Sequence, residues 1–356
     1  MKVALVYDRV NKWGGAERII LALYKIFPKA DLFTSVYNKK KAPWAKVFNV
    51  KTSFLQNLPF ASSSHELLGT FMPLAFESFD FNGYDLVISL TSEAAKGIIT
   101  RPDTKHICIC LTPTRYLWSG YNDYFRNPLL KVIAKPAVKY LRFWDKIAAN
   151  RSDKILAIST AVKGRIKKYY NLDSEVINLP VEFSAKSISE KTGDYYLIVS
   201  RLVYYKRVDL AVDVFNKLKL PLKIIGTGSQ FDNLKAKANE NIKFLGEVSE
   251  DKLGEYYKNC KGLIFPGNED FGLVMVEAQS FGKPVLAFRG GGALDIVIEG
   301  KTGDFFNEQT VESLEKVMEK FNNNRYNTKL CRENALRFSF ENFKKTLLLQ
   351  IQKTNL

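Results

Sequence analysis

Short apolar runs alternate along the chain with longer stretches in which apolar residues recur at the spacing of a helix. We interpret the runs as buried strands and the stretches between them as helices. Strands and helices that alternate in this way are typical of parallel sheets covered by helices on both faces, so the pattern predicts an α/β fold with doubly wound sheets. The predicted strands are residues 3–7, 86–89, 107–111, 155–158, 196–200, 222–225, 242–244, 263–265 and 285–288.

Residues 182–193 interrupt this alternation, because no apolar periodicity runs through them. A stretch of this kind is typical of a boundary between two domains. We predict a first domain over residues 1–182 and a second over residues 183–337, each Rossmann-like, which face one another across a central cleft. The chain shows neither a solenoid repeat nor a low-complexity tract.

The length and composition suit a soluble two-domain protein. The 356 residues are 46% hydrophobic and 25% charged, which is enough for two domains with full cores. No apolar stretch reaches the ~18 residues of a membrane span, and residues 1–7 are interpreted as a core strand rather than a signal peptide, so we expect a cytoplasmic protein. Cys108 and Cys110 alternate on a predicted strand, which favours reduced core thiols over a disulfide or a metal site.

Positive charge is concentrated in the first half of the chain. Residues 1–180 hold 27 Lys and Arg against 14 Asp and Glu, a net charge of +13 out of +16 for the whole chain. An anionic partner is implied, either a phospholipid surface or nucleic acid. Residues 129–149 favour the membrane, because they mix basic with large apolar residues around a break at Pro136. The alternative is a surface helix packed on its own domain with a solvated basic face.

Two glutamates, Glu269 and Glu277, bracket the point where a predicted strand turns into a helix near Gly272. Open α/β sheets bind ligands at the carboxyl ends of their strands, and the amino end of a helix attracts a diphosphate. Glu269 in the loop is therefore a candidate for holding sugar hydroxyls, and Glu277 on the helix for holding a ribose. A solvated loop acid and a helix-surface acid are the alternative.

Arg201 lies at the carboxyl end of the predicted strand 196–200, and Lys206 lies in the loop that follows it. From there both side chains can reach one diphosphate and neutralise it without a metal. A solvated basic loop is the alternative. Gly226 lies in a glycine loop that follows residues 222–225, and Gly14 and Gly15 follow the first strand, where paired glycines let the backbone approach a phosphate. Gly14 and Gly15 lack the third spaced glycine of the dinucleotide fingerprint, which disfavours a nicotinamide enzyme.

Metal and nucleophile chemistry have no support in the sequence. His65 and His106 are the two histidines, and no clustered ligands surround them. Serine hydrolase motifs are absent as well. We therefore expect neither a metal nor another cofactor.

These residues resemble the family-4 retaining glycosyltransferases of the GT-B fold over nearly the whole chain. Residues 269–277 resemble that family's Glu-x7-Glu motif, residues 200–207 its diphosphate clamp, and residues 14–18 its first glycine loop. Residues 112–118, 143–145, 157–159 and 165–170 resemble a mannosyltransferase-like subgroup that builds bacterial surface polysaccharides. Residues 337–343 are similar to the segment that leads the last helix, residues 338–356, back onto the first domain.

The resemblance implies a role for each matching residue. Arg201 and Lys206 would hold the donor diphosphate, with N–H groups from Gly15, Gly272 and Leu273. Glu277 would bind the ribose and Glu269 the transferred sugar, while Phe271 and Gly226 would line the donor site. One departure is Leu111, where the subgroup usually has a histidine.

The implied reaction is transfer of a hexose, mannose from GDP-mannose above all, to a lipid-linked or oligosaccharide acceptor. It would take place at the inner face of the cell membrane, with no nucleic acid involved, and would retain the configuration of the sugar without an enzymic nucleophile. The alternatives are a catalytically weak sugar-nucleotide-binding protein, to which Leu111 and the basic first half point, and a sugar-nucleotide epimerase or phosphorylase on the same fold.

Overall fold

The computed structural model describes residues 1–58, 69–181, 193–321 and 325–354. His65 and most of the predicted boundary segment, residues 182–192, lie outside the described residues. The chain divides into two compact units, which we call unit 1 and unit 2. Unit 1 comprises Met1–Asn178 and Phe343–Leu356, and unit 2 comprises Leu179–Asn342.

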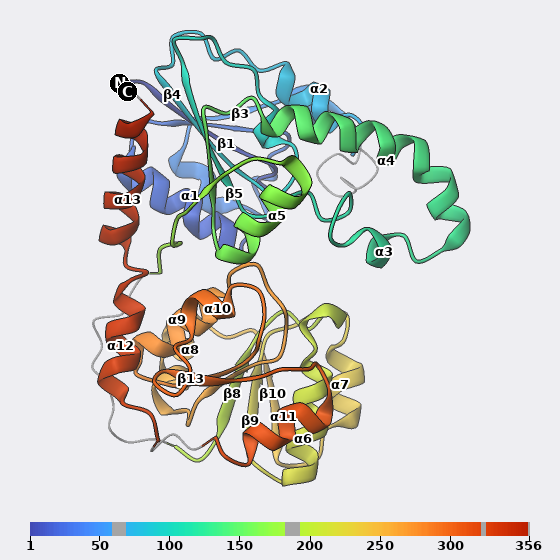
Figure 1. Cartoon of the computed structure of the whole chain (residues 1–356), viewed down its shortest axis with the longest axis vertical. Coiled ribbons are helices and arrows are strands. Elements are labelled where there is room, and N and C mark those ends of the chain that lie inside the picture. Colours follow the sequence, from blue (N-terminus) through green and yellow to red (C-terminus); the bar gives the residue numbers. More distant parts are fainter. Residues whose placement is uncertain (59–68, 182–192, 322–324, 355–356) are drawn as a thin grey trace. The chain divides into compact units, whose positions relative to one another are not determined.

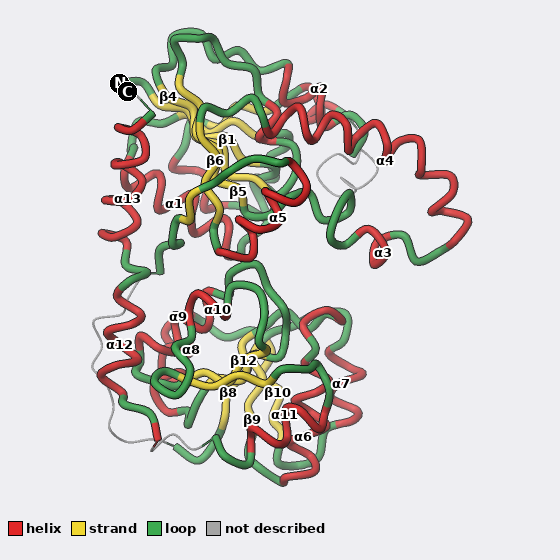
Figure 2. The backbone as a smooth tube through the Cα atoms, viewed as in Figure 1, coloured by secondary structure: helices red, strands yellow, loops and turns green. Residues whose placement is uncertain are grey.

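Unit 1 is built on a seven-stranded parallel sheet with the order β3-β2-β1-β4-β5-β6-β7. Its central strands β1 and β4 are wholly buried and mostly apolar, as expected when helices cover both faces of a sheet (Figures 1 and 2). The strands are β1 (Val3–Tyr7), β2 (Asp31–Thr34), β3 (Val50–Thr52), β4 (Leu86–Thr91), β5 (Lys105–Cys110), β6 (Lys154–Ala157) and β7 (Glu175–Val176). The helices are α1 (Gly15–Ile26), α2 (Met72–Glu77), α3 (Tyr121–Tyr124), α4 (Pro128–Ala149), α5 (Thr160–Tyr170) and most of α13 (Phe340–Lys353).

Unit 2 is built on a six-stranded parallel sheet with the order β10-β9-β8-β11-β12-β13. Its core lies between this sheet and α6 and α11, around Phe215, Leu286 and Phe306. The strands are β8 (Tyr196–Val199), β9 (Leu222–Ile225), β10 (Ile242–Gly246), β11 (Leu263–Phe265), β12 (Val285–Phe288) and β13 (Gly303–Phe306). The helices are α6 (Val208–Leu218), α7 (Phe231–Lys237), α8 (Glu250–Asn259), α9 (Leu273–Ser280), α10 (Ala293–Ile296), α11 (Val311–Met318) and α12 (Thr328–Leu336).

The predicted α/β fold with two doubly wound parallel sheets is confirmed, and each of the nine predicted strands is present within two residues of its expected bounds. The apolar pattern of the sequence did not predict β2, β3, β7 and β13. Three of them, β3, β7 and β13, lie at sheet edges, and β3 and β7 are too short and too exposed to show an apolar run. The last helix, α13, is tied to unit 1 by Gln350, whose Nε2 donates to Glu175 Oε2 at 2.6 Å.

Candidate functional site

The strand order of unit 2 reverses between β8 and β11, since β9 and β10 extend the sheet on one side and β12 and β13 on the other. Loops that follow two such strands diverge and leave room for a ligand at the sheet edge. The loop after β8 runs into the 3₁₀ turn η5 (Tyr204–Lys206), and the loop after β11 carries Glu269. The Lys206 ammonium and the Glu269 carboxylate form an ion pair at this point, and Lys206 is only 8% exposed.

The backbone around Glu269 is held by glycines on both sides. A methyl group on Gly267 would lie 3.1 Å from the carbonyl oxygen of Lys206, so this loop packs directly against η5. A methyl group on Gly291 would lie 1.9 Å from the carbonyl oxygen of Glu269, and the Gly292 N–H donates to that same oxygen at 2.8 Å. The 1.9 Å approach at position 291 excludes a side chain there, and the approach at position 267 is tight, so close backbone packing on both sides positions Glu269.

The loop that carries Arg201 is held in a similar way. Gly226 adopts a φ of 128°, and a methyl group there would lie 1.9 Å from the Ser200 carbonyl oxygen. The Leu202 N–H donates to the Thr227 carbonyl at 2.8 Å, and the Arg201 guanidinium donates to the Tyr205 hydroxyl at 2.7 Å. The glycine at 226 therefore has a packing reason in addition to the donor-binding role predicted for it.

Helix α9 starts directly behind Glu269. Its N-cap is Gly272, with a φ of 103° that side chains rarely adopt, and the preceding Phe271 is buried with its ring edge against Phe338. The first helical residue is Leu273. Glu277, one turn into the helix, accepts a hydrogen bond from the Tyr257 hydroxyl at 2.7 Å. The helix amino end and a helix-borne carboxylate thus belong to the same segment as the Lys206–Glu269 pair.

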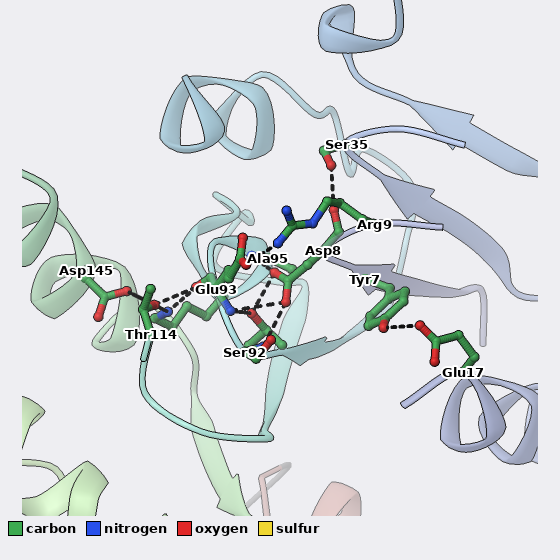
Figure 3. Close-up of polar contacts among 12 residues, drawn as sticks. Tyr7, Asp8, Arg9, Glu17, Ser35, Ser92, Glu93, Ala95, Thr114 and Asp145 are labelled. Carbon is green, nitrogen blue, oxygen red and sulfur yellow. Dashed lines mark hydrogen bonds and ion pairs between the residues drawn. The ribbon is translucent and has the colours of Figure 1, made fainter. Parts of the chain in front are cut away.

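Gly14 and Gly15, the other two predicted donor-binding residues, belong to unit 1. Gly15 is the first residue of α1, and Gly14 caps the helix in an extended conformation with a φ of 178°. The turn is supported by Glu17, whose carboxylate accepts a hydrogen bond from the Tyr7 hydroxyl at 2.7 Å (Figure 3). Burial, reinforced by this carboxylate, raises the pKa of Tyr7 well above its usual value.

Unit 1 contains a second polar cluster that the sequence analysis missed. Its sheet reverses between β1 and β4, and Asp8, Arg9 and Glu93 lie in the loops after those strands. The Asp8 carboxylate accepts hydrogen bonds from the N–H groups of Ser92 and Ala95, both at 2.8 Å, and so shapes the loop that carries Glu93 (Figure 3). Arg9 forms an ion pair with Glu93. The position of these residues directly after predicted strands was the available signal.

Lys96 and Asp145 form a fully buried ion pair beside this cluster. Their Nζ and Oδ1 atoms are 2.7 Å apart, and both side chains are 1% exposed. Asp145 also accepts hydrogen bonds from the Thr114 hydroxyl at 2.9 Å, the Trp118 indole at 2.7 Å and the Tyr170 hydroxyl at 2.7 Å. Burial works against the charged form of Lys96, but the Asp145 carboxylate and the other acidic groups nearby together outweigh it, so the pKa of Lys96 is raised.

Neither a metal site nor a membrane span is found in the parts of the chain that the structure describes. No group of three or more His, Cys, Asp or Glu side chains there is arranged to hold a metal ion. No helix among the described residues is long and apolar enough to cross a bilayer.

Comparison with known proteins finds a family match in the second unit. Residues 181–338 match the family described as glycosyl transferases group 1. The chain is 33% identical over 216 residues to an uncharacterized glycosyltransferase of Methanocaldococcus jannaschii, an alignment that spans 58% of this chain and 60% of that protein. It is 22% identical over 368 residues to O-antigen chain mannosyltransferase C of Escherichia coli, covering 95% of this chain and 93% of that protein.

Solved structures share the fold of the whole chain. The Anabaena protein HepE in complex with UDP superposes with a TM-score of 0.73 at 18% identity, covering 99% of this chain and all of that one. The lipopolysaccharide outer core galactosyltransferase WaaB superposes with a TM-score of 0.69 at 19% identity, covering 98% and 100%. The protein therefore has the GT-B fold, and its residues 181–338 are similar to the group 1 glycosyltransferases.

Proposed function

We propose that this protein is a retaining hexosyltransferase that moves mannose from GDP-mannose to a lipid-linked or oligosaccharide acceptor at the inner face of the cell membrane. The observation that carries the proposal is the Lys206–Glu269 pair at the strand reversal of unit 2, directly ahead of the amino end of α9. The similarity to an O-antigen chain mannosyltransferase over 95% of the chain supports the choice of sugar and of acceptor class.

When a nucleoside diphosphate binds, the Lys206 ammonium leaves its ion pair with Glu269 and pairs with the diphosphate, which carries more negative charge. Glu269 is then available to accept hydrogen bonds from the sugar hydroxyls. Arg201 and the N–H groups of Gly272 and Leu273 complete the shell around the phosphates, and Glu277 accepts a hydrogen bond from the ribose.

The transfer step proceeds without an enzymic nucleophile. The bond between the anomeric carbon and the diphosphate oxygen breaks, and the acceptor hydroxyl forms the new bond on the same face of the sugar. The proton of that hydroxyl passes to the leaving diphosphate oxygen. Lys206 and Arg201 stabilise the negative charge that develops on the leaving group, so the reaction needs neither a metal nor another cofactor.

We assign the acceptor to unit 1, where Arg9 and Glu93 lie at the strand reversal of the other sheet. Their side chains are 15% and 20% exposed, so a ligand can reach both. A guanidinium next to a carboxylate offers donors and acceptors to sugar hydroxyls or to a phosphate of the acceptor. Replacing Glu93 with Gln should raise the acceptor KM and leave donor binding unchanged.

The first experiment measures the thermal midpoint with GDP, UDP, ADP and their sugars, and follows each donor for slow hydrolysis. A ligand at about 100 times its Kd should stabilise the fold by roughly 2.7 kcal/mol. We expect a selective shift with GDP and GDP-mannose. The Lys206→Ala variant should show no thermal shift with these ligands. The Glu269→Gln variant should still bind the nucleotide and show the shift, but should no longer hydrolyse the donor.

Lys217→Ala is the matched control. Lys217 forms an ion pair with Glu315 at 2.7 Å on the surface of the same unit, so this variant also breaks a lysine–glutamate pair. It should bind and turn over donor like the unaltered protein. Unchanged donor binding by the Lys206→Ala variant would disprove the role of Lys206 in holding the diphosphate. A thermal shift with UDP alone would mean that the donor is a UDP-sugar and not GDP-mannose.

A catalytically weak sugar-nucleotide-binding protein is the second candidate, and Leu111 favours it. Leu111 directly follows β5, and its N–H donates to the Thr91 carbonyl at 2.8 Å, so its backbone is held where the related subgroup usually carries an imidazole. Under this alternative the nucleotide binds without turnover, and Leu111→His should increase the hydrolysis rate. An epimerase would instead convert the free sugar nucleotide without any acceptor.

A further inference from the structure

Helix α4 of unit 1 has one face that packs on its own unit. Trp144 and Ala148 belong to the core cluster that also contains Phe76 and Ile98. Nearer the middle of the helix, Val138 and Leu141 pack with Leu117 and with the partly buried side chains of Tyr121 and Phe125 around α3. This contact anchors the helix, and its amino-terminal half extends beyond the sheet of unit 1 (Figure 1).

A second face of α4 carries large apolar side chains that are exposed. Their spacing matches one side of a helix, and at about 100° per residue they fall within an arc of roughly 100°. Four of them are exposed by 67% to 69%, which is unusual for large apolar groups on one helix. The stripe consists of Leu129, Val132, Ile133, Tyr140, Phe143 and Ile147.

A third face of α4 is basic. Its five residues occupy an adjoining arc of roughly 80° on the same helical wheel, next to the apolar stripe. The one acidic residue of the helix, Asp145, is buried and paired with Lys96, so it does not offset this charge. Arg142 and Lys131 donate to Leu117 O and Asn122 Oδ1, while the other three are exposed. The basic row consists of Lys131, Lys135, Lys139, Arg142 and Lys146.

The combination of the two rows selects the partner. Water alone accounts for an exposed row of basic side chains, but an exposed apolar stripe beside it indicates contact with an apolar partner. A second copy of the chain would bring a second basic row to the same place, where like charges repel. Nucleic acid would pair with the basic row and leave the apolar stripe in water. The boundary between lipid headgroups and acyl chains suits both rows at once.

We infer that α4 is an interfacial helix that docks unit 1 on a membrane containing anionic phospholipid. The apolar stripe enters the headgroup–acyl boundary, and the basic row lies at the level of the lipid phosphates. The inference deepens the proposed function, because it names the surface that would bring the enzyme to a lipid-linked acceptor. Vesicle binding itself requires no sugar transfer, so the two proposals fail separately.

The test is co-sedimentation of the full chain with vesicles of phosphatidylcholine, with and without one third phosphatidylglycerol. We expect binding to the anionic vesicles that weakens as salt rises. Lys135→Gln/Lys139→Gln should weaken it by about fivefold per lysine. Ile133→Gln/Phe143→Gln should weaken it at least ~10-fold, since two large apolar groups no longer leave water. Glutamine is chosen because it preserves helix propensity.

Matched controls come from the same unit. Ile99→Gln removes a side chain that is 54% exposed outside α4, and Lys163→Gln removes an exposed lysine of α5. Both should bind vesicles like the unaltered protein. All variants should retain the thermal midpoint and the donor hydrolysis rate in solution, which separates loss of docking from loss of fold or of chemistry.

Four outcomes would overturn the inference. They are no binding to either vesicle, equal binding to neutral and anionic vesicles, unchanged binding by the α4 variants, and a change from dimer to monomer in the Ile133→Gln/Phe143→Gln variant with its vesicle binding intact. The last result would assign the stripe to a second copy of the chain.

Discussion

Replacing Asp145 with alanine should strongly destabilise unit 1. Its carboxylate is 1% exposed and receives the Lys96 ammonium at 2.7 Å together with hydrogen bonds from Thr114, Trp118 and Tyr170. Without it, a buried ammonium keeps the Glu93 carbonyl and the Thr114 hydroxyl as partners and loses its counter-charge. Breaking a buried pair in this way costs about 3–5 kcal/mol.

The reverse change should cost less. Lys96→Met removes the ammonium but leaves Asp145 with three neutral donors, so we expect a loss of about 2 kcal/mol. The double variant should be more stable than the sum of the single losses predicts, by about 1–3 kcal/mol, because it leaves no unpaired buried charge. Lys167→Met is the control, since Lys167 and Asp173 pair at 3.0 Å with both side chains exposed. That change should not alter stability measurably.

Urea unfolding followed by tryptophan fluorescence measures the effect in the right part of the chain. The four tryptophans, Trp13, Trp44, Trp118 and Trp144, all fall within residues 1–178, so the signal reports unit 1 and not unit 2. A midpoint that shifts without a change of slope gives the loss of stability directly. A loss below about 1 kcal/mol for Asp145→Ala, or additive losses in the double variant, would refute the reasoning.

Three further predictions concern pH, backbone conformation and metal. Burial lowers the pKa of His106 to about 4 from 6.5, so the unfolded chain takes up a proton below pH 6.5 that the folded chain does not accept until about pH 4. The free energy of unfolding of unit 1 should therefore fall as pH falls through this window, by about 2 kcal/mol at pH 5. Urea titrations at several pH values should show this loss, and the His106→Gln variant should show a weaker dependence on pH. Gly226→Ala should weaken donor binding in the thermal-shift assay, because its methyl group would collide with the Ser200 carbonyl; unchanged binding would show that the loop adapts. Removal of metal with EDTA should leave donor turnover unchanged, and a loss restored by Mg²⁺ would contradict the metal-free mechanism.

Apart from β2, which is only four residues long and has polar residues at both ends, the interior strands of both sheets were predictable. They are buried on both faces, which requires apolar runs such as residues 3–7 and 263–265. β13 was missed because of its polar composition, and not because it is short and exposed as β3 and β7 are. It begins with Gly303 and Asp304, and the buried carboxylate is satisfied by the Tyr326 hydroxyl at 2.7 Å and by Arg325 at 3.1 Å. A polar residue can occupy a buried strand when its partners arrive from a later part of the chain, which no local pattern reveals.

Helix α4 illustrates the same limit at a surface. The sequence indicated both a membrane-facing helix and a helix packed on its own domain, and left them as alternatives. In the structure the helix packs on its own unit through Leu141 and Trp144, and a second apolar side that includes Ile133 and Phe143, 67% and 68% exposed, stays uncovered. The membrane contact of that side is our proposal. Periodicity shows that a helix has apolar positions on more than one side, but only the packed unit decides which side is covered.

The sequence by itself determined the α/β class, the place and order of nine strands, and the strand ends after which the predicted site residues of unit 2 lie. These follow from burial and from turn residues, which are properties of short segments. Only the tertiary structure decided that Lys206 meets Glu269 and that Lys96 meets Asp145. Those partners are 63 and 49 positions apart, and their meeting depends on strand order and loop packing. The physical reason is that a charge is buried at acceptable cost only where the fold places an opposite charge beside it, and this placement depends on the folded chain as a whole.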